Sequence, residues 1–275
     1  MSKDIRKPKV AGQFYPASPP ELKKNIQKYF NQVESQDFAY NKLYGVIAPH
    51  AGYIYSGAVA AYSYQLIAKT KPARLIIIAP SHREFIEGFS IYPGQAYSTP
   101  LGEVNIDQEL VDKITDNCSA VERNNAGHKE EHSLEVQLPF LQNVLEDFSI
   151  VPIVAGNVDH EQVRELGSYL AELDKKSELC LIASSDLSHF HSYESARNKD
   201  RNLIEELKQF STDKLIKGHK DRSLEACGMI PISVLLEYAR ELGDAKFMVL
   251  DYRNSGDTAG GKSRVVGYLA AAIYK

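Results

Sequence analysis

Cysteine, long apolar runs and clustered basic charge are all scarce in this sequence of 275 residues. Its three cysteines, Cys118, Cys180 and Cys227, are too few for a disulfide framework, which favours a reducing, cytoplasmic setting. Apolar runs such as LIIIAP and LCLIAS are far shorter than the about 20 residues that span a membrane. The first ten residues carry charges without the apolar stretch of a signal peptide. With a formal net charge of −4 and no basic run, neither a membrane nor nucleic acid is expected as a partner.

Short runs rich in Val, Ile and Leu recur along the whole chain, with little alternation between apolar and polar residues. This pattern is typical of strands that are buried on both faces of a sheet. The runs cover residues 43–49, 74–80, 148–156, 178–185 and 246–252. Helical patterns lie between them. The alternation predicts a single α/β domain over residues 1–275, with a central, mostly parallel or mixed sheet flanked by helices.

The segment GDTAGGKS, residues 256–263, matches the phosphate-binding pattern G-x-x-x-x-G-K-[ST]. A phosphate-binding loop needs a buried strand that runs directly into it and a helix that leaves it. Here the strand pattern ends several residues before Gly256, and VVGYLAAAIY, residues 265–274, reads as a last strand. We therefore interpret the segment as a glycine-rich turn and its match as accidental.

Histidines follow three of the predicted strands. His50 ends IAPH, His82 ends the near-copy IAPSH, and Asp186, His189 and His191 follow LCLIASS. In α/β folds, ligands bind just beyond the carboxyl ends of the strands. Imidazole is also the commonest metal ligand and acid–base group. The sequence therefore predicts a shared site at this edge of the sheet.

Cys227 is a further candidate, because Gly228 and Pro231 mark the start of a helix directly after it. The dipole and free N–H groups at a helix N-terminus favour a thiolate. The alternative is a small buried apolar residue, the usual role of cysteine, which suits Cys180 and Cys118 better.

The segment HKEEH spells H-x-x-E-H, a zinc-protease signature that would place His128 and His132 on one helix face. Gly127 is a poor helix interior residue, and the apolar stripe of the helix begins only after His132. We expect instead that Glu131, His132 and Glu135 form a polar helix start that lines the same pocket. First-turn acids that complement the helix dipole are the simpler alternative.

Several motifs in order along the chain give a family resemblance. They are VAGQFYP, IAPHAGYIYSG, PSH, EHSLEVQLPFL, ASSDLSH, ACGMIP and the closing NSGD with VVGYLAA. Together they resemble the Memo family, also called AmmeMemoRadiSam system protein B, over about Val10 to Tyr274. The resemblance implies a fold similar to class III extradiol ring-cleaving dioxygenases of the LigB type.

The resemblance also implies a metal site. By motif, the metal ligands fall on His50, His82 and Cys227. Asp186 and His189 match nearby site residues of the family, and Glu131 with His132 match its EHS segment. If the protein is catalytic, we expect His189 to act as general acid–base, and Asp186 or Glu131 to orient a histidine.

The expected metal is iron. Copper and zinc are alternatives, because a thiolate here replaces the carboxylate of most two-histidine iron sites. One function is a redox-metal enzyme that acts on a small molecule with O₂. The others are a non-catalytic module that binds metal, a peptide or a phosphopeptide, and a zinc-dependent hydrolase. The sequence leaves open whether the protein is an enzyme. The family name also implies an AMMECR1-like protein and a radical SAM protein as partners.

Overall fold

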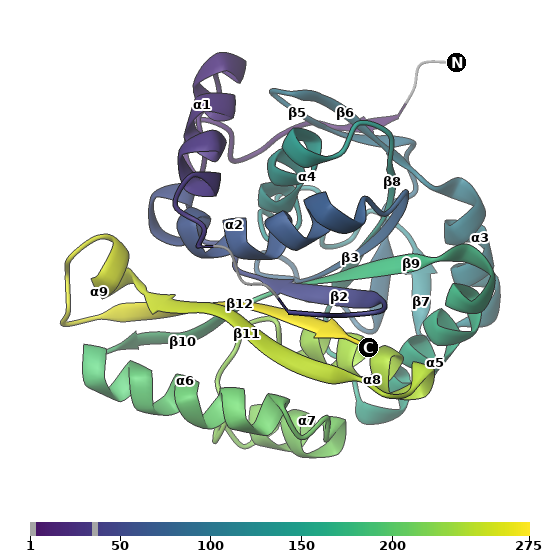
Figure 1. Ribbon diagram of the computed structural model, residues 1–275. Coiled ribbons are helices and arrows are strands. Elements are labelled where there is room, and N and C mark those ends of the chain that lie inside the picture. Colours follow the sequence, from purple (N-terminus) through teal and green to yellow (C-terminus); the bar gives the residue numbers. More distant parts are fainter. Residues whose placement is uncertain (1–3, 35–37) are drawn as a thin grey trace.

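The computed structural model describes residues 4–34 and 38–275, and every strand in these ranges joins one sheet (Figure 1). Four parallel strands form its centre. In spatial order they are β8 (Ser149–Ala155), β3 (Arg74–Pro80), β9 (Leu179–Ser184) and β2 (Leu43–Ala48). All residues of β2 and β9 are buried, as expected for strands covered on both faces. The corresponding strand predictions from the sequence are confirmed.

Antiparallel strands extend both sides of this parallel centre. The long β12 (Val265–Tyr274) pairs with β11 (Lys246–Asn254) along one side, and with β2 and then β10 (Asp186–His191) along the other. At the opposite edge lie β6 (Gly102–Ile106), β5 (Ala96–Thr99) and β1 (Ile5–Arg6), and the short β4 (Phe89–Ile91) and β7 (Val121–Arg123) branch from β8. The predicted α/β class with a mixed central sheet is confirmed.

Helices cover both faces of the sheet (Figure 1). One face carries α1 (Pro19–Phe30), α2 (Tyr53–Thr70) and α4 (Leu138–Val144), and the other carries α5 (His160–Ser177), α6 (Tyr193–Leu207), α7 (Thr212–Lys220) and α8 (Met229–Leu242). The remaining helices are α3 (Gln108–Asn117), the 3₁₀ turn η1 (Glu135–Gln137) and the short α9 (Ser255–Thr258). Within residues 4–34 and 38–275, no helix combines the length and the apolar character needed to cross a membrane.

Two segments differ in detail from the sequence expectations. Residues 186–191, expected as a loop, form strand β10, which pairs with β12 through register shifts at His189 and His191. The helix expected to start near His132 begins three residues later as a 3₁₀ turn, and Pro139 lies in the first turn of the α-helix that continues it. The glycine-rich segment follows β11 through α9 and leads into β12, so the predicted last strand is confirmed.

The strand order decides which loops meet. Because β9 lies between β2 and β3 and all three are parallel, their carboxyl ends lie side by side at one edge of the sheet. The residues that directly follow them, including His50, Asp186 and His82, therefore enter the same region. This is the position at which parallel α/β sheets bind ligands.

Candidate metal centre

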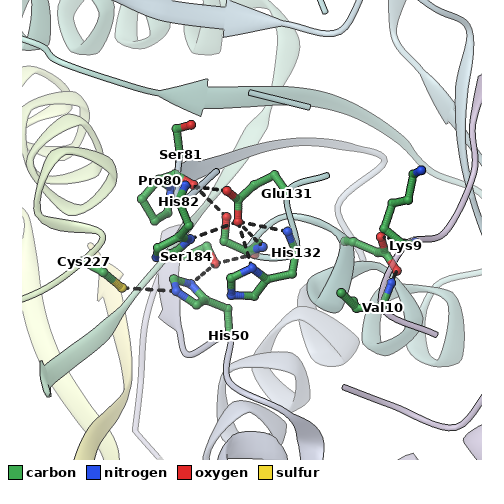
Figure 2. Close-up of polar contacts among 12 residues, drawn as sticks. Lys9, Val10, His50, Pro80, Ser81, His82, Glu131, His132, Ser184 and Cys227 are labelled. Atoms are coloured by element: carbon green, nitrogen blue, oxygen red, sulfur yellow. Dashed lines mark hydrogen bonds and ion pairs between the residues drawn. The ribbon is translucent and has the colours of Figure 1, made fainter. Parts of the chain in front are cut away.

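Three histidines from distant parts of the chain converge at this edge. His50 follows β2, His82 follows β3, and His132 lies just before η1. Each offers a ring nitrogen, and these nitrogens lie within 4.8 Å of one another. The ring centroids of His82 and His132 are 4.8 Å apart (Figure 2). The ring centroid of His50 lies 5.1 Å from that of His82 and 5.6 Å from that of His132. The three side chains could hold one metal ion.

The His50 side chain is buried and has a partner at each ring nitrogen. Its Nδ1 lies 2.8 Å from Ser184 Oγ, and its Nε2 lies 3.2 Å from Cys227 Sγ (Figure 2). The pKa of His50 lies well below its usual value, because burial disfavours the imidazolium and because His82 and His132 are close. A neutral imidazole keeps one nitrogen lone pair, which is the form that binds metal.

Glu131 connects two of the histidines. Its carboxylate accepts hydrogen bonds from the backbone N–H groups of His82, His132 and Ser133, and its Oε1 lies 3.0 Å from His82 Nδ1. Burial would raise the pKa of Glu131, but its contacts with the His132 and His82 side chains outweigh burial and bring the pKa well below its usual range. Because the carboxylate is ionised and can only accept, His82 Nδ1 must donate, and in a neutral ring this places the lone pair on Nε2.

His132 supplies an observation that tests the site for metal binding. Its Nδ1 lies 3.1 Å from Glu131 Oε1, yet this buried nitrogen makes no hydrogen bond of acceptable geometry with any described residue. A buried polar atom without a well-formed hydrogen bond costs free energy that a coordinated ion would recover. Three clustered imidazoles, one of them with such a nitrogen, therefore fit a metal ion.

Cys227 lies beside His50 because α8 begins very close to the end of β9. A Cβ added to Gly228 would lie 2.2 Å from the carbonyl oxygen of Ser184, so only glycine allows this approach. Cys227 Sγ accepts a hydrogen bond of 3.2 Å from the backbone N–H of Asp186. Burial, followed by the charge of Asp186, raises the pKa of the Cys227 thiol, so without a cation it stays protonated.

Asp186 and His189 lie on β10, next to these residues. The buried Asp186 Oδ1 accepts the backbone N–H of His50 at 2.8 Å, so it fixes the His50 backbone rather than its ring. Burial raises the pKa of Asp186, and the His50 N–H partly offsets this effect. The His189 ring is half-buried, packs against Phe190, and is close enough for its charge to help lower the pKa of His50.

The other histidine of HKEEH lies elsewhere. His128 Nδ1 lies 2.6 Å from Tyr97 Oη and its Nε2 lies 3.0 Å from the carbonyl oxygen of Ser90, so both ring nitrogens are used within the core. Burial lowers the pKa of His128 to about 3. The zinc-protease interpretation of this motif fails, because only His132 of the pair reaches the site. His191 binds Glu225 at 2.7 Å instead of joining the cluster.

Ser184 and Gln137 are buried polar residues in contact with the site that the sequence motifs do not indicate. A signal existed for Ser184, because a run of buried strand residues ends in two serines and an aspartate. Buried hydroxyl and amide groups need partners, so polar residues at the end of a buried strand indicate a polar network there.

The comparisons with known proteins agree with the motifs. The Memo-like protein family matches residues 6–272. MEMO1 family proteins of Aquifex aeolicus, Methanosarcina barkeri and Nitrosopumilus maritimus are 39%, 37% and 35% identical to this chain, over 96–98% of this chain and 97–100% of their own lengths.

Among solved structures, an uncharacterized protein of Escherichia coli K12 has a similar fold. It covers 85% of this chain and 100% of its own, with a TM-score of 0.53 and 11% sequence identity. At this identity the likeness concerns the fold alone. The family profile and the full-length relatives are the stronger result, and they show that the chain belongs to the Memo-like protein family.

Proposed function

We propose that the protein binds a redox-active metal ion at the meeting point of His50, His82, His132 and Cys227. The observation that carries the proposal is the approach of three imidazole nitrogens to within 4.8 Å of one another. Cys227 Sγ, 3.2 Å from His50 Nε2, is the sulfur donor beside them. Imidazole with thiolate suits iron, copper or zinc, and these residues would hold the ion, which would supply redox chemistry if it is iron or copper.

The metal would supply the one-electron and O₂ chemistry of a dioxygenase-type reaction on a small molecule. The chain supplies position and protons. Glu131 fixes the His82 ring, and Asp186 fixes the His50 backbone and contacts Cys227. His189, which is half-buried on β10 and close enough to contribute to the low pKa of His50, is the proposed general acid–base for the substrate.

Metal binding by substituted proteins tests the ligand set. The protein is purified without oxygen, stripped with a chelator and titrated with Co²⁺, whose absorption shows a thiolate-to-cobalt charge-transfer band when sulfur binds. We expect His50→Ala and His82→Ala to abolish binding. We expect His132→Ala to weaken it and Cys227→Ser to remove the charge-transfer band. Unchanged titrations in all four variants would contradict the centre.

Catalysis is tested separately with the Fe²⁺-loaded protein. We expect uptake of O₂ with catechol-like or indole-like compounds, and its loss in His189→Gln with metal affinity retained. Activity of zinc-loaded protein without O₂ would instead indicate a hydrolase. If the protein binds metal but shows neither reaction with any compound tried, the result would indicate a non-catalytic binding protein.

One observation favours a second candidate function, in which the protein is a non-catalytic module that binds a peptide. In residues 4–34 and 38–275, four large apolar side chains are exposed, and each lies within five residues of a site histidine along the chain. They are Ile54 and Tyr55 after His50, Phe85 after His82, and Phe190 after His189. Exposed apolar side chains beside a polar site are typical of a surface that binds a partner.

A further inference from the structure

A chain of buried polar side chains connects helix α2 to the His50 ring. Tyr64 Oη lies 2.5 Å from Gln137 Oε1, Gln137 Nε2 lies 2.7 Å from Ser184 Oγ, and Ser184 Oγ lies 2.8 Å from His50 Nδ1. The four residues come from α2, η1, the end of β9 and the loop after β2. None is more than 2% exposed, so water does not compete for these hydrogen bonds.

The direction of each hydrogen bond follows from the surrounding carbonyl groups. Gln137 Nε2 also faces the carbonyl oxygens of Pro49, at 3.2 Å, and Ala48, at 3.5 Å. An amide oxygen there would set acceptor against acceptor, so the amide nitrogen occupies this position and donates to Ser184 Oγ. Oε1 then faces Tyr64, which donates because burial raises its pKa well above the usual value.

Ser184 has only one proton to give, and its position is fixed. Ser184 Oγ lies 2.7 Å from the carbonyl oxygen of Ser133, which can only accept, so the hydroxyl donates there. The same oxygen accepts from Gln137, and its remaining lone pair faces His50 Nδ1. His50 Nδ1 must therefore carry the ring proton. With the ring proton on Nδ1, the lone pair of the neutral ring is on Nε2, the nitrogen that faces Cys227 Sγ.

We propose that Ser184, with Gln137 and Tyr64 behind it, is a positioning residue that holds His50 in the tautomer with the proton on Nδ1. The network thereby keeps the Nε2 lone pair directed at the metal position. The consequence for metal affinity rests on the proposed metal centre, whereas the tautomer itself does not. Partners of this kind around a ligating histidine typically change metal affinity 10- to 100-fold.

The tautomer is measured first, in metal-free protein labelled with ¹⁵N-histidine. The chain has eight histidines, so His50→Gln identifies the signals of residue 50. We expect a protonated Nδ1 and an unprotonated Nε2 in the unsubstituted protein, and ¹⁵N shifts that move towards a mixture of tautomers in Ser184→Ala. Ser184→Thr, which retains a hydroxyl, is expected to keep the single tautomer.

Metal affinity is measured next, by competition between the protein and a chelator for Zn²⁺. We expect Ser184→Ala to bind about 10- to 100-fold more weakly than the unsubstituted protein. Ser63→Ala is the matched control, because Ser63 Oγ is equally buried and donates a 2.7 Å hydrogen bond to the carbonyl oxygen of Ile47 instead of facing a histidine ring nitrogen. Its affinity is expected to stay unchanged.

The outcomes separate the two proposals. A proton on Nε2 of His50 in the unsubstituted protein overturns the positioning role, and this measurement needs no variant to fold. The positioning role is also overturned if Ser184→Ala keeps both the His50 tautomer and the Zn²⁺ affinity of the unsubstituted protein. A third outcome is that the tautomer shifts in Ser184→Ala as expected, but neither the unsubstituted protein nor any variant binds Zn²⁺, Co²⁺ or Fe²⁺. In that case the proposed metal centre is wrong and the positioning role stands.

Discussion

Two buried glutamates of the segment EHSLE, Glu131 and Glu135, have different partners and different roles. Glu131 lies at the candidate metal centre, where it accepts from backbone N–H groups and contacts the His82 ring. Glu135 faces the other way. It binds the Arg6 guanidinium, the Tyr15 hydroxyl and the backbone N–H groups of Lys9 and Val10, which tie the N-terminal segment to the core.

The difference lies in the partners. Arg6 is a permanent cation, so the ion pair with Glu135 is fixed and suits a structural role. The imidazoles around Glu131 have lone pairs to offer and can bind an ion on their far side. Arg6 also donates to the backbone carbonyl oxygens of His128 and Glu131, so the two regions are neighbours. Substitutions can show whether stability and metal binding divide between them.

The largest effect on stability is expected for Arg6→Met. It removes one member of a pair in which both side chains are almost fully buried, and leaves the Glu135 carboxylate without its cation. We expect a loss of about 3–5 kcal/mol in the free energy of unfolding, measured by urea denaturation. Lys9→Ala is the control, because its ion pair with Glu130 is on the surface and no measurable change is expected.

Glu131→Gln should give the opposite balance. The variant keeps the shape of the side chain but loses the charge that holds His82 Nδ1 as a donor. We expect Zn²⁺ affinity to fall about 10- to 100-fold, measured by chelator competition, with a smaller loss of stability than in Arg6→Met. If the two variants changed stability and affinity to the same extent, the proposed division between the two glutamates would be wrong.

A smaller, pH-dependent effect is expected from His128, on the Arg6 side of the comparison. Its folded pKa of about 3 lies below the 6.5 of an exposed histidine. Between these values the unfolded chain binds a proton that the folded protein does not, so stability falls as pH falls. The contribution is about 1.4 kcal/mol per pH unit. In metal-free protein, urea denaturation at pH 7, 6 and 5 should therefore show a shallower decline for His128→Gln, whereas an equal decline would contradict the assignment.

The sequence predicted much of the central sheet and part of the site. The runs at 43–49, 74–80, 148–156 and 178–185 became β2, β3, β8 and β9, because a strand buried on both faces must be apolar throughout. His50 and His82 could be selected because they follow such strands. Residues 186–191 could not be recognised as β10, since this edge strand carries polar residues and pairs irregularly with β12.

The choice between His128 and His132 shows where a motif is not enough. Both belong to HKEEH, and the spacing alone would place them together. In the fold, both ring nitrogens of His128 make hydrogen bonds inside the core, whereas the His132 ring joins the other two histidines and its Nδ1 contacts Glu131 Oε1 without the geometry of a hydrogen bond. The proton positions on the Ser184 network likewise depend on carbonyl groups from several segments.

By itself, the sequence determined which segments form the buried strands and that histidines follow them, because burial and chain order are local properties of the pattern. Only the tertiary structure decided that His132 joins His50 and His82, that the Cys227 sulfur lies against His50, and that Ser184 Oγ lies within hydrogen-bond distance of His50 Nδ1. These contacts join residues far apart in the sequence, 177 positions apart for His50 and Cys227, and their geometry depends on strand order and on the packing of α8 against the end of β9.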